Sequence, residues 1–299
     1  MINTNEKVLL FSDKIFTSND NMESLMKQFA SLAANKLLLY TQNENDTLLL
    51  DTAFNGTPEE LNNIIVQYKP NINAIFDDFG STALLITAED DKFDMTRILI
   101  DNGANVNSSL NNGVTSLLFA VQNQNLNMVK LLIAHNAIID DQSNDGRTPL
   151  MVASYENNLE IIKLLVSNGA NIDEKNNEGN TALVFACDHD KLENIKFLIN
   201  NGANIDARNN GGANALMFAS YKNNLELVKL LVSNGAEINL KDKYGDTALI
   251  VAASKGNIEI VKYLIDNGAS IDEKNNDGKN ALMYAQEKNF MDIIELLKK

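Results

Sequence analysis

The sequence contains little of the chemistry on which enzymes depend. Its 299 residues include one cysteine, Cys187, and two histidines, His135 and His189. A single cysteine forms no internal disulfide, which fits a reducing compartment. No Cys/His cluster has metal-ligand spacing, no Ser/His/Asp arrangement is credible, and no glycine-rich phosphate loop is present. We therefore expect no catalytic residue, no metal and no cofactor, and we predict that the protein is not an enzyme. The alternative is an enzyme with a cryptic site in residues 1–44 or near Asp188 and His189.

Positive charge is also scarce. Lys and Arg total 25 against 40 Asp and Glu, for a net charge of −15. Phosphate backbones and anionic membranes both attract surplus Lys and Arg, so we expect neither nucleic acid nor membrane as a partner. Residues 1–20 contain one short apolar run, Val8–Phe11, too short for a signal peptide or a membrane span. The Asn-rich composition points to a low-GC bacterium. We expect a cytoplasmic monomer, with export as an effector as the alternative.

What the sequence has in quantity is an internal repeat. Aromatic residues make up only 6% and tryptophan is absent, so the core must be aliphatic. A first series of glycines recurs every 33 residues, at Gly80, Gly113, Gly146, Gly179, Gly212, Gly245 and Gly278. A second series has the same interval, at Gly103, Asn136, Gly169, Gly202, Gly235 and Gly268. No insertion interrupts residues 77–299, so this part consists of units of constant length.

Each unit predicts two helices separated by a tight turn. In the unit around residue 150, Thr148 suits a helix N-cap and Pro149 the first helical position. The pattern predicts helices near 148–155 and 158–167, joined by Asn157-Asn158 in a left-handed turn. Ile161, Ile162, Leu164 and Leu165 are expected to face the neighbouring units. Gly169 is expected to end the second helix in a left-handed conformation.

These residues resemble the ankyrin repeat. The resemblance rests on Thr148-Pro149-Leu150 and on Gly169-Ala170-Asn171-Ile172-Asp173, with their copies. It implies an all-α solenoid of stacked helix-turn-helix units that binds another protein and carries no cofactor. We assign the ankyrin-repeat domain to residues 45–299, with repeats near 45–76, 77–109, 110–142, 143–175, 176–208, 209–241, 242–274 and 275–299. The first, divergent unit opens with Thr47-Leu48-Leu49-Leu50.

The sequence departs from the family pattern after the Thr-Pro-Leu triplet. The family usually has a hydrogen-bonding histidine there, whereas this chain has Leu85, Leu118, Met151, Val184, Met217, Ile250 and Met283. We expect a reduced network of hydrogen bonds between repeats, replaced by apolar packing. Residues 1–44 are not repeat-like, but Met22–Tyr40 carries apolar residues at helical spacing. We interpret 1–44 as a helical cap on the first repeat, with a docking or secretion segment as the alternative.

Three local patterns resemble a calcium site, a nucleophile and an acid–base pair, but none has the residues or the geometry that its chemistry needs. Glu174–Gly179 and Glu273–Gly278 resemble the start of an EF-hand loop, but its twelfth place holds Phe185 or Tyr284 instead of a bidentate Glu. Cys187 follows Ala186 on a first helix, where a small buried side chain explains it better than a nucleophile. Asp188 and His189 are adjacent and could suggest an acid–base pair. Adjacent side chains on a helix diverge by about 100°, so we do not expect these two to act together.

The resemblance implies a concave binding face formed by the first helices and the turns between repeats. Seven side-chain pairs fall on this face, one in each of the seven repeats from residue 77 onward. The partner-binding residues that we predict are Phe79, Glu89, Asp90, Tyr155, Glu156, Asp188, His189, Tyr221, Lys222, Tyr244 and Lys255. Acidic residues dominate early in the chain and lysines late, where Lys175, Arg208, Lys241 and Lys274 add to them. Exposed aromatic rings are typical of interface hot spots. A recent duplication of two repeats would also explain the matching Tyr155 and Tyr221.

Overall fold

The computed structural model describes residues 44–187 and 192–298. The regular elements of these residues are helices, together with one isolated β-bridge between Ser109 and Thr115. The chain divides into two compact units, Met1–Phe119 and Ala120–Lys299, and the division falls within helix α7 (Ser116–Gln122). Each unit is described by itself below. The predicted segment 1–44 lies outside the described residues, apart from Glu44.

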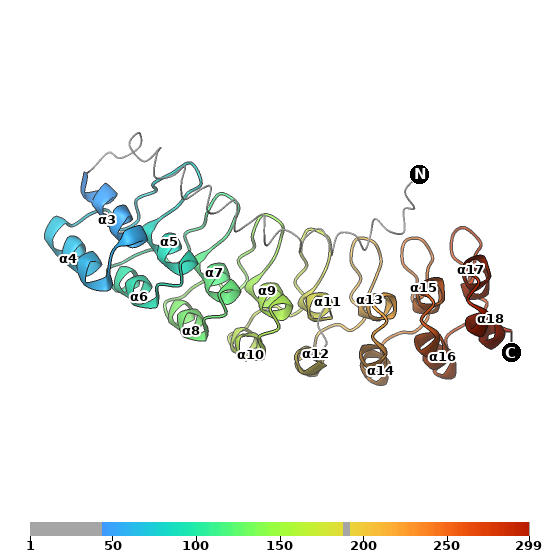
Figure 1. Ribbon diagram of the computed structural model, residues 1–299. Coiled ribbons are helices and arrows are strands. Elements are labelled where there is room, and N and C mark those ends of the chain that lie inside the picture. The colour runs from blue at the N-terminus through green and yellow to red at the C-terminus, as the bar shows by residue number, and fades with distance from the viewer. Residues whose placement is uncertain (1–43, 188–191, 299) are drawn as a thin grey trace. The chain divides into compact units, whose positions relative to one another are not determined.

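Helices follow one another in pairs in both units (Figure 1). In the first unit, α3 (Glu44–Asn55) packs on α4 (Pro58–Tyr68), and α5 (Ala83–Glu89) packs on α6 (Phe93–Asp101). The inner, first helices of the second unit are α9 (Pro149–Tyr155), α11 (Ala182–Ala186), α13 (Ala215–Tyr221), α15 (Ala248–Lys255) and α17 (Ala281–Lys288). The outer, second helices are α8 (Leu126–Ala134), α10 (Leu159–Ser167), α12 (Leu192–Asn200), α14 (Leu225–Ser233), α16 (Ile258–Asp266) and α18 (Met291–Leu297).

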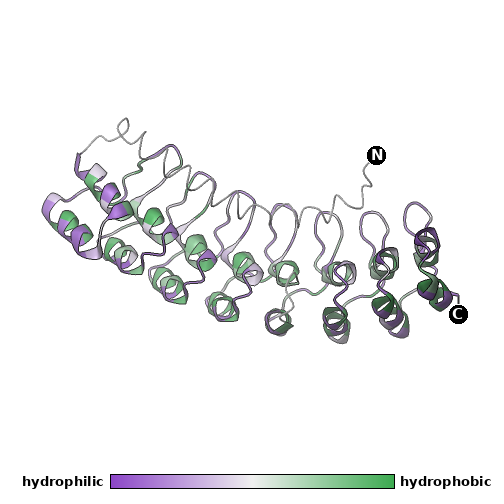
Figure 2. Ribbon diagram, viewed as in Figure 1, coloured by the Kyte–Doolittle hydropathy of each residue, from purple (hydrophilic) through white to green (hydrophobic). Residues whose placement is uncertain are grey.

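Successive helix pairs of the second unit stack in two layers. Inner helices pack on inner helices, as α13 does on α15, and outer helices pack on outer helices, as α14 does on α16. Polar hairpin turns, called fingers here, join each pair to the next and project from the helices (Figure 2). The predicted helices near 148–155 and 158–167 are confirmed by α9 and α10.

Short polar side chains at the helix starts explain where the inner helices begin. The hydroxyl oxygen of Thr148 accepts a hydrogen bond from the Met151 amide at 3.3 Å, as predicted for an N-cap. Where threonine is replaced, Asn214 and Asn280 cap their helices in the same way, accepting from the amides of Met217 and Met283 at 3.0 Å. The helical pairs therefore keep their phase although the family triplet varies.

The divergent first helix begins earlier than the sequence predicted. Thr47 was expected to open a helix, but α3 already includes Glu44, so Thr47 lies within the helix. Leu49 and Leu50 of this helix are buried, whereas Leu48 is 37% exposed.

Aliphatic side chains fill the space between the layers, as the composition required. Ile161, Ile162 and Leu165 are fully buried, whereas Leu164 is half-buried and faces a hollow on the outer helices. At the position of the family histidine, Leu85, Met151 and Ile250 are buried and confirm the apolar replacement. Val184 is only half-buried, and Met283 is 41% exposed.

Hydrogen bonds between repeats are nevertheless numerous, and they lie in the fingers. Asparagine amides donate to the carbonyl of the residue 33 positions earlier, as Asn177 does to Asn144 at 2.7 Å and Asn210 to Asn177 at 2.8 Å. At the base of the fingers, the Asp173 carboxylate accepts from the Asn204 amide at 2.8 Å. Apolar packing is therefore only part of what replaces the family histidine.

The fingers also explain the first glycine series. Gly179 has φ 81°, and a Cβ there would lie 2.6 Å from Oδ1 of Asn210 in the next finger. Gly169 has φ 90° with no atom near its Cβ position, so only its backbone conformation calls for glycine. The predicted left-handed end of the second helix is confirmed.

Candidate binding surface

The predicted pairs lie where the inner helices end. Glu89 is the last residue of α5 and Asp90 its C-cap, while Tyr155 and Glu156 hold the same places on α9. Tyr221 ends α13 and Lys222 caps it. Lys255 is the last residue of α15, which is one residue longer because Gly256 forms the C-cap. The structure thus brings the predicted side chains to equivalent positions, while Asp188 and His189 lie outside the described residues.

The first unit carries a dense group of carboxylates at the end of α5. Burial, together with the neighbouring Asp90 and Asp77, raises the pKa of Glu89 to about 6. The ammonium of Lys92 lies 2.7 Å from the Asp90 carboxylate and also donates to the carbonyls of Ala53 and Phe54 at the end of α3. Lys92 therefore connects the acidic group to the preceding helix pair.

The fingertip of the same unit exposes an aromatic ring. Phe79 is 45% exposed, as predicted. The Asp77 carboxylate accepts hydrogen bonds from the backbone amides of Phe79 and Ser81, each at 2.9 Å. Asp77 therefore shapes the turn that presents Phe79.

Lysine–aromatic contacts characterise the second unit. The Lys255 ammonium lies 4.2 Å from the centre of the Tyr221 ring, and Lys243 lies 5.1 Å from that of Tyr244. Lys222 lies 5.5 Å from the ring of Phe218, one helical turn earlier. Sequence reasoning missed Lys243 and Phe218, although the i,i+4 spacing of Phe218 and Lys222 predicts their contact.

The tyrosines are less accessible than the sequence suggested. Tyr155, Tyr221 and Tyr244 were expected to be exposed, but all three are half-buried. Part of the area of each ring is therefore already covered by the rest of the fold. Changing these tyrosines is therefore expected to affect folding as well as binding, and their test requires a measurement of stability.

The basic residues at the finger bases have a structural role that the sequence did not reveal. Lys175 donates to the Arg208 carbonyl at 2.8 Å, and Lys241 donates to the Lys274 carbonyl at 3.0 Å. Arg208 donates to the carbonyl of Lys241. These side chains link successive fingers, so we no longer count them as partner-binding charges.

A buried polar group in the last two repeats was also missed. The Asn275 amide donates to the Asp246 carboxylate at 2.8 Å and to the Tyr284 hydroxyl at 3.0 Å. Burial is the main reason that the pKa of Asp246 rises to about 6. All three side chains satisfy one another, so the group serves to join the repeats. The signal was available in sequence, because Asn176 and Asn209 precede Asn275 at the same position.

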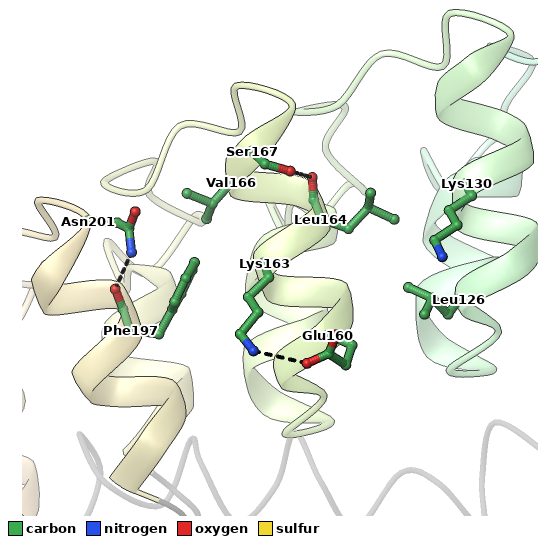
Figure 3. Close-up of a pocket in the computed structure, with 9 residues that line it drawn as sticks. All are labelled: Leu126, Lys130, Glu160, Lys163, Leu164, Val166, Ser167, Phe197 and Asn201. Carbon is green, nitrogen blue, oxygen red and sulfur yellow. Dashed lines mark hydrogen bonds and ion pairs between the residues drawn. The ribbon is translucent and has the colours of Figure 1, made fainter.

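The outer helices form a hollow of about 510 Å³ between α8, α10 and α12 (Figure 3). Its polar side chains are largely satisfied within their own helices. Lys163 pairs with Glu160 at 3.0 Å, Ser167 donates to the Leu164 carbonyl at 2.9 Å, and Asn201 donates to the Phe197 carbonyl at 2.8 Å. Ligand pockets need a few polar groups that converge on the ligand. Lys163, Ser167 and Asn201 are instead engaged within their own helices, so they do not supply such groups to this hollow.

Residues 44–187 and 192–298 show no other sign of a cofactor site. Within them, no three His, Cys, Asp or Glu side chains are grouped to hold a metal ion. Cys187 is buried and donates to the Leu183 carbonyl, as expected for a small core residue. None of the helices in this described part is long and apolar enough to cross a membrane.

The fold is a repeat scaffold for protein–protein interaction. Its helix pairs stack, its finger turns project, and side chains are presented at the ends of the inner helices. A family model for ankyrin repeats in three copies matches overlapping segments 49–143, 87–176, 135–209, 169–242 and 216–299. The chain therefore belongs to the ankyrin-repeat family. A search of curated proteins gave no match.

Solved structures with a similar fold include the ankyrin repeat domain of Bcl-3, described as a unique member of the IkappaB protein family. The two chains are 26% identical with a TM-score of 0.65, and the alignment covers 73% of this chain and 100% of that one.

Proposed function

We propose that the chain is a non-catalytic binding module whose partner contacts the inner-helix ends and fingertips of the second unit. The observation that carries the proposal is the cluster of Tyr221, Lys222 and Lys255 at the adjoining ends of α13 and α15. Tyrosine rings give large contact area at low entropic cost, and nearby charges steer the approach of a partner. Tyr155 and Tyr244 extend this surface. Phe79, Glu89 and Asp90 offer a separate surface on the first unit.

The proposal is tested by capturing partners from lysate and measuring the affinity of each for purified variants. We expect Tyr155→Ala/Tyr221→Ala to weaken binding at least thirtyfold, because truncating a central interface aromatic commonly costs roughly 2 kcal/mol. Lys222→Glu should mainly slow association and change its salt dependence.

Two controls separate binding from folding. Thermal melts of each tyrosine variant show whether weaker binding results from a less stable fold or from the loss of a contact with the partner. Lys163→Glu alters an outer-helix lysine and should leave binding unchanged. Normal binding by folded tyrosine variants, together with loss in Lys163→Glu, would show that the partner uses the outer helices.

A further inference from the structure

Three lysines recur at the ends of successive inner helices in the second unit. Lys222 caps α13, Lys255 ends α15 and Lys288 ends α17, so they lie 33 residues apart. All three are exposed. Since α13 packs on α15 and α15 packs on α17, the three side chains form a row across adjacent helices. We call Lys222, Lys255 and Lys288 the lysine row.

Two lysines of the row, Lys255 and Lys288, differ from the lysines of the outer helices. Lys163, Lys196 and Lys229 each pair with a glutamate three residues earlier, at 2.8–3.0 Å. Neither Lys255 nor Lys288 forms an ion pair with a carboxylate of the described residues. Glu287, next to Lys288, is instead held by Lys279 at 2.7 Å. Lys255 and Lys288 therefore present positive charge that no described carboxylate pairs, on a chain whose net charge is −15.

The spacing of the row restricts the shape of a complementary chain. Packed helices lie about 8–10 Å apart between axes. In a polyproline II segment, every third residue faces the same way and recurs at about 9 Å. Residues on one face of a β-strand recur at about 7 Å, which falls short of the helix spacing. A polyproline II segment can therefore bring one carboxylate to each lysine.

The aromatic ring within the row supports the same conformation. The Tyr221 ring lies beside Lys255, with the ammonium 4.2 Å from its centre. Proline-rich segments dock against aromatic side chains because their extended conformation is already formed before binding. The part of the Tyr221 ring that Lys255 and the fold leave exposed offers an apolar surface for residues that separate the carboxylates.

We propose that the lysine row binds an extended acidic peptide segment in which Asp or Glu occurs at every third position. The proposal rests on the proposed function, since it uses the same surface, and it specifies the chemistry of the partner. The first unit is no competitor for such a segment, because Glu89 and Asp90 occupy the corresponding helix end there.

The test measures binding of fluorescent peptides to the full chain by anisotropy at low salt. The probe repeats Glu-Pro-Pro, and two peptides of equal length serve as controls. One has the same composition with its glutamates contiguous, and the other has Lys in place of Glu. We expect the Glu-Pro-Pro peptide to bind at least tenfold more tightly than either. Equal binding of the contiguous peptide would overturn the proposed register, and binding of the Lys peptide would overturn the charge complementarity.

Matched variants locate the site. Lys222→Gln/Lys255→Gln/Lys288→Gln should weaken binding about tenfold, the size expected for three exposed ion pairs. Lys163→Gln/Lys196→Gln/Lys229→Gln removes the same charge from the outer helices and should change affinity less than twofold. Equal losses in the two variants would mean that only net charge matters and would refute the row. The peptide comparison uses the unaltered protein, so it stands even if a variant is less stable.

The outcomes separate this inference from the proposed function. Capture of a partner through Tyr155 and Tyr221, without binding of the Glu-Pro-Pro peptide, overturns only the acidic segment. Capture that depends on the outer-helix lysines overturns the proposed function, whatever the peptide does.

Discussion

Equivalent helix ends carry opposite charge in two regions of the molecule. In the first unit, α5 ends in Glu89 and Asp90, whereas α13, α15 and α17 of the second unit end in the lysine row. The C-terminus of a helix carries partial negative charge, which favours cations and disfavours anions. The lysines therefore stabilise the helices that carry them, and the acidic pair opposes its own helix.

This difference changes how the two surfaces are interpreted. Stability alone accounts for lysines at helix ends, so their role in binding must be tested apart from their role in folding. Stability does not account for Glu89 and Asp90, because burial and, to a smaller extent, the neighbouring carboxylates raise the pKa of Glu89 to about 6. The acidic surface persists in the fold because Lys92 binds Asp90 and the end of α3 together.

The largest expected effect comes from removing that link. Lys92→Met takes away one ion pair and two hydrogen bonds to the carbonyls of Ala53 and Phe54. Hydrogen bonds to charged groups contribute about 1.5–3 kcal/mol, so we expect a loss of about 2 kcal/mol in the free energy of unfolding. Urea unfolding followed by circular dichroism measures it.

The control is an outer-helix lysine whose ion pair is local. Lys163→Met loses only the exposed partner Glu160, and such pairs contribute about 0.5 kcal/mol or less. Equal losses in the two variants would show that Lys92 is an ordinary surface lysine, and the acidic region would then need another source of stability.

The repeat made most of the fold predictable from sequence. The spacing of Gly146, Gly179 and Gly212 gave the unit length, and Thr148 with Pro149 gave the start of α9 to within one residue. These features act within a few residues of the chain, so a pattern in the sequence is enough to detect them. The start of α3 was misjudged because its unit lacks the local signals.

The surface was less predictable because exposure depends on the neighbouring repeat. Tyr221 occupies a position where the family exposes side chains, yet Lys255 of the next repeat lies over its ring. The sequence predicts a free charge at Lys175, whereas its ammonium donates to the Arg208 carbonyl. Contacts at an interval of about 33 residues are formed by stacking, and a single repeat does not reveal them.

A second prediction concerns pH and the acidic end of α5. Because the pKa of Glu89 rises from 4.5 to about 6 on folding, the folded state holds its proton more tightly. This contribution to stability is fully present below pH 4.5 and is lost as the pH rises through 6. Glu89→Gln removes the charge, so we expect it to stabilise the protein by about 1 kcal/mol at pH 7, after allowance for solvent screening, and to have no effect at pH 4.

Urea unfolding at pH 7 and pH 4 measures whether Glu89→Gln raises or lowers the free energy of unfolding. Glu160→Gln is the matched control, because Glu160 is exposed and paired with Lys163, so its loss should slightly destabilise the protein at pH 7. A destabilising effect of Glu89→Gln at pH 7 would mean that the acidic pair supports its helix, contrary to the comparison above.

The smallest expected effect tests the other side of the comparison. Lys255→Gln removes a cation from the end of α15 and from the face of the Tyr221 ring. Both interactions are exposed, so we expect a loss of about 0.5 kcal/mol in the free energy of unfolding at low salt. The loss should shrink at high salt, where the Debye length falls to about 3 Å. Lys262→Gln, in the middle of α16, should have no comparable effect because position 262 is far from the helix end. If the two variants unfold alike at low salt, the lysines do not stabilise their helices. Both charged helix ends would then require a binding partner as their explanation.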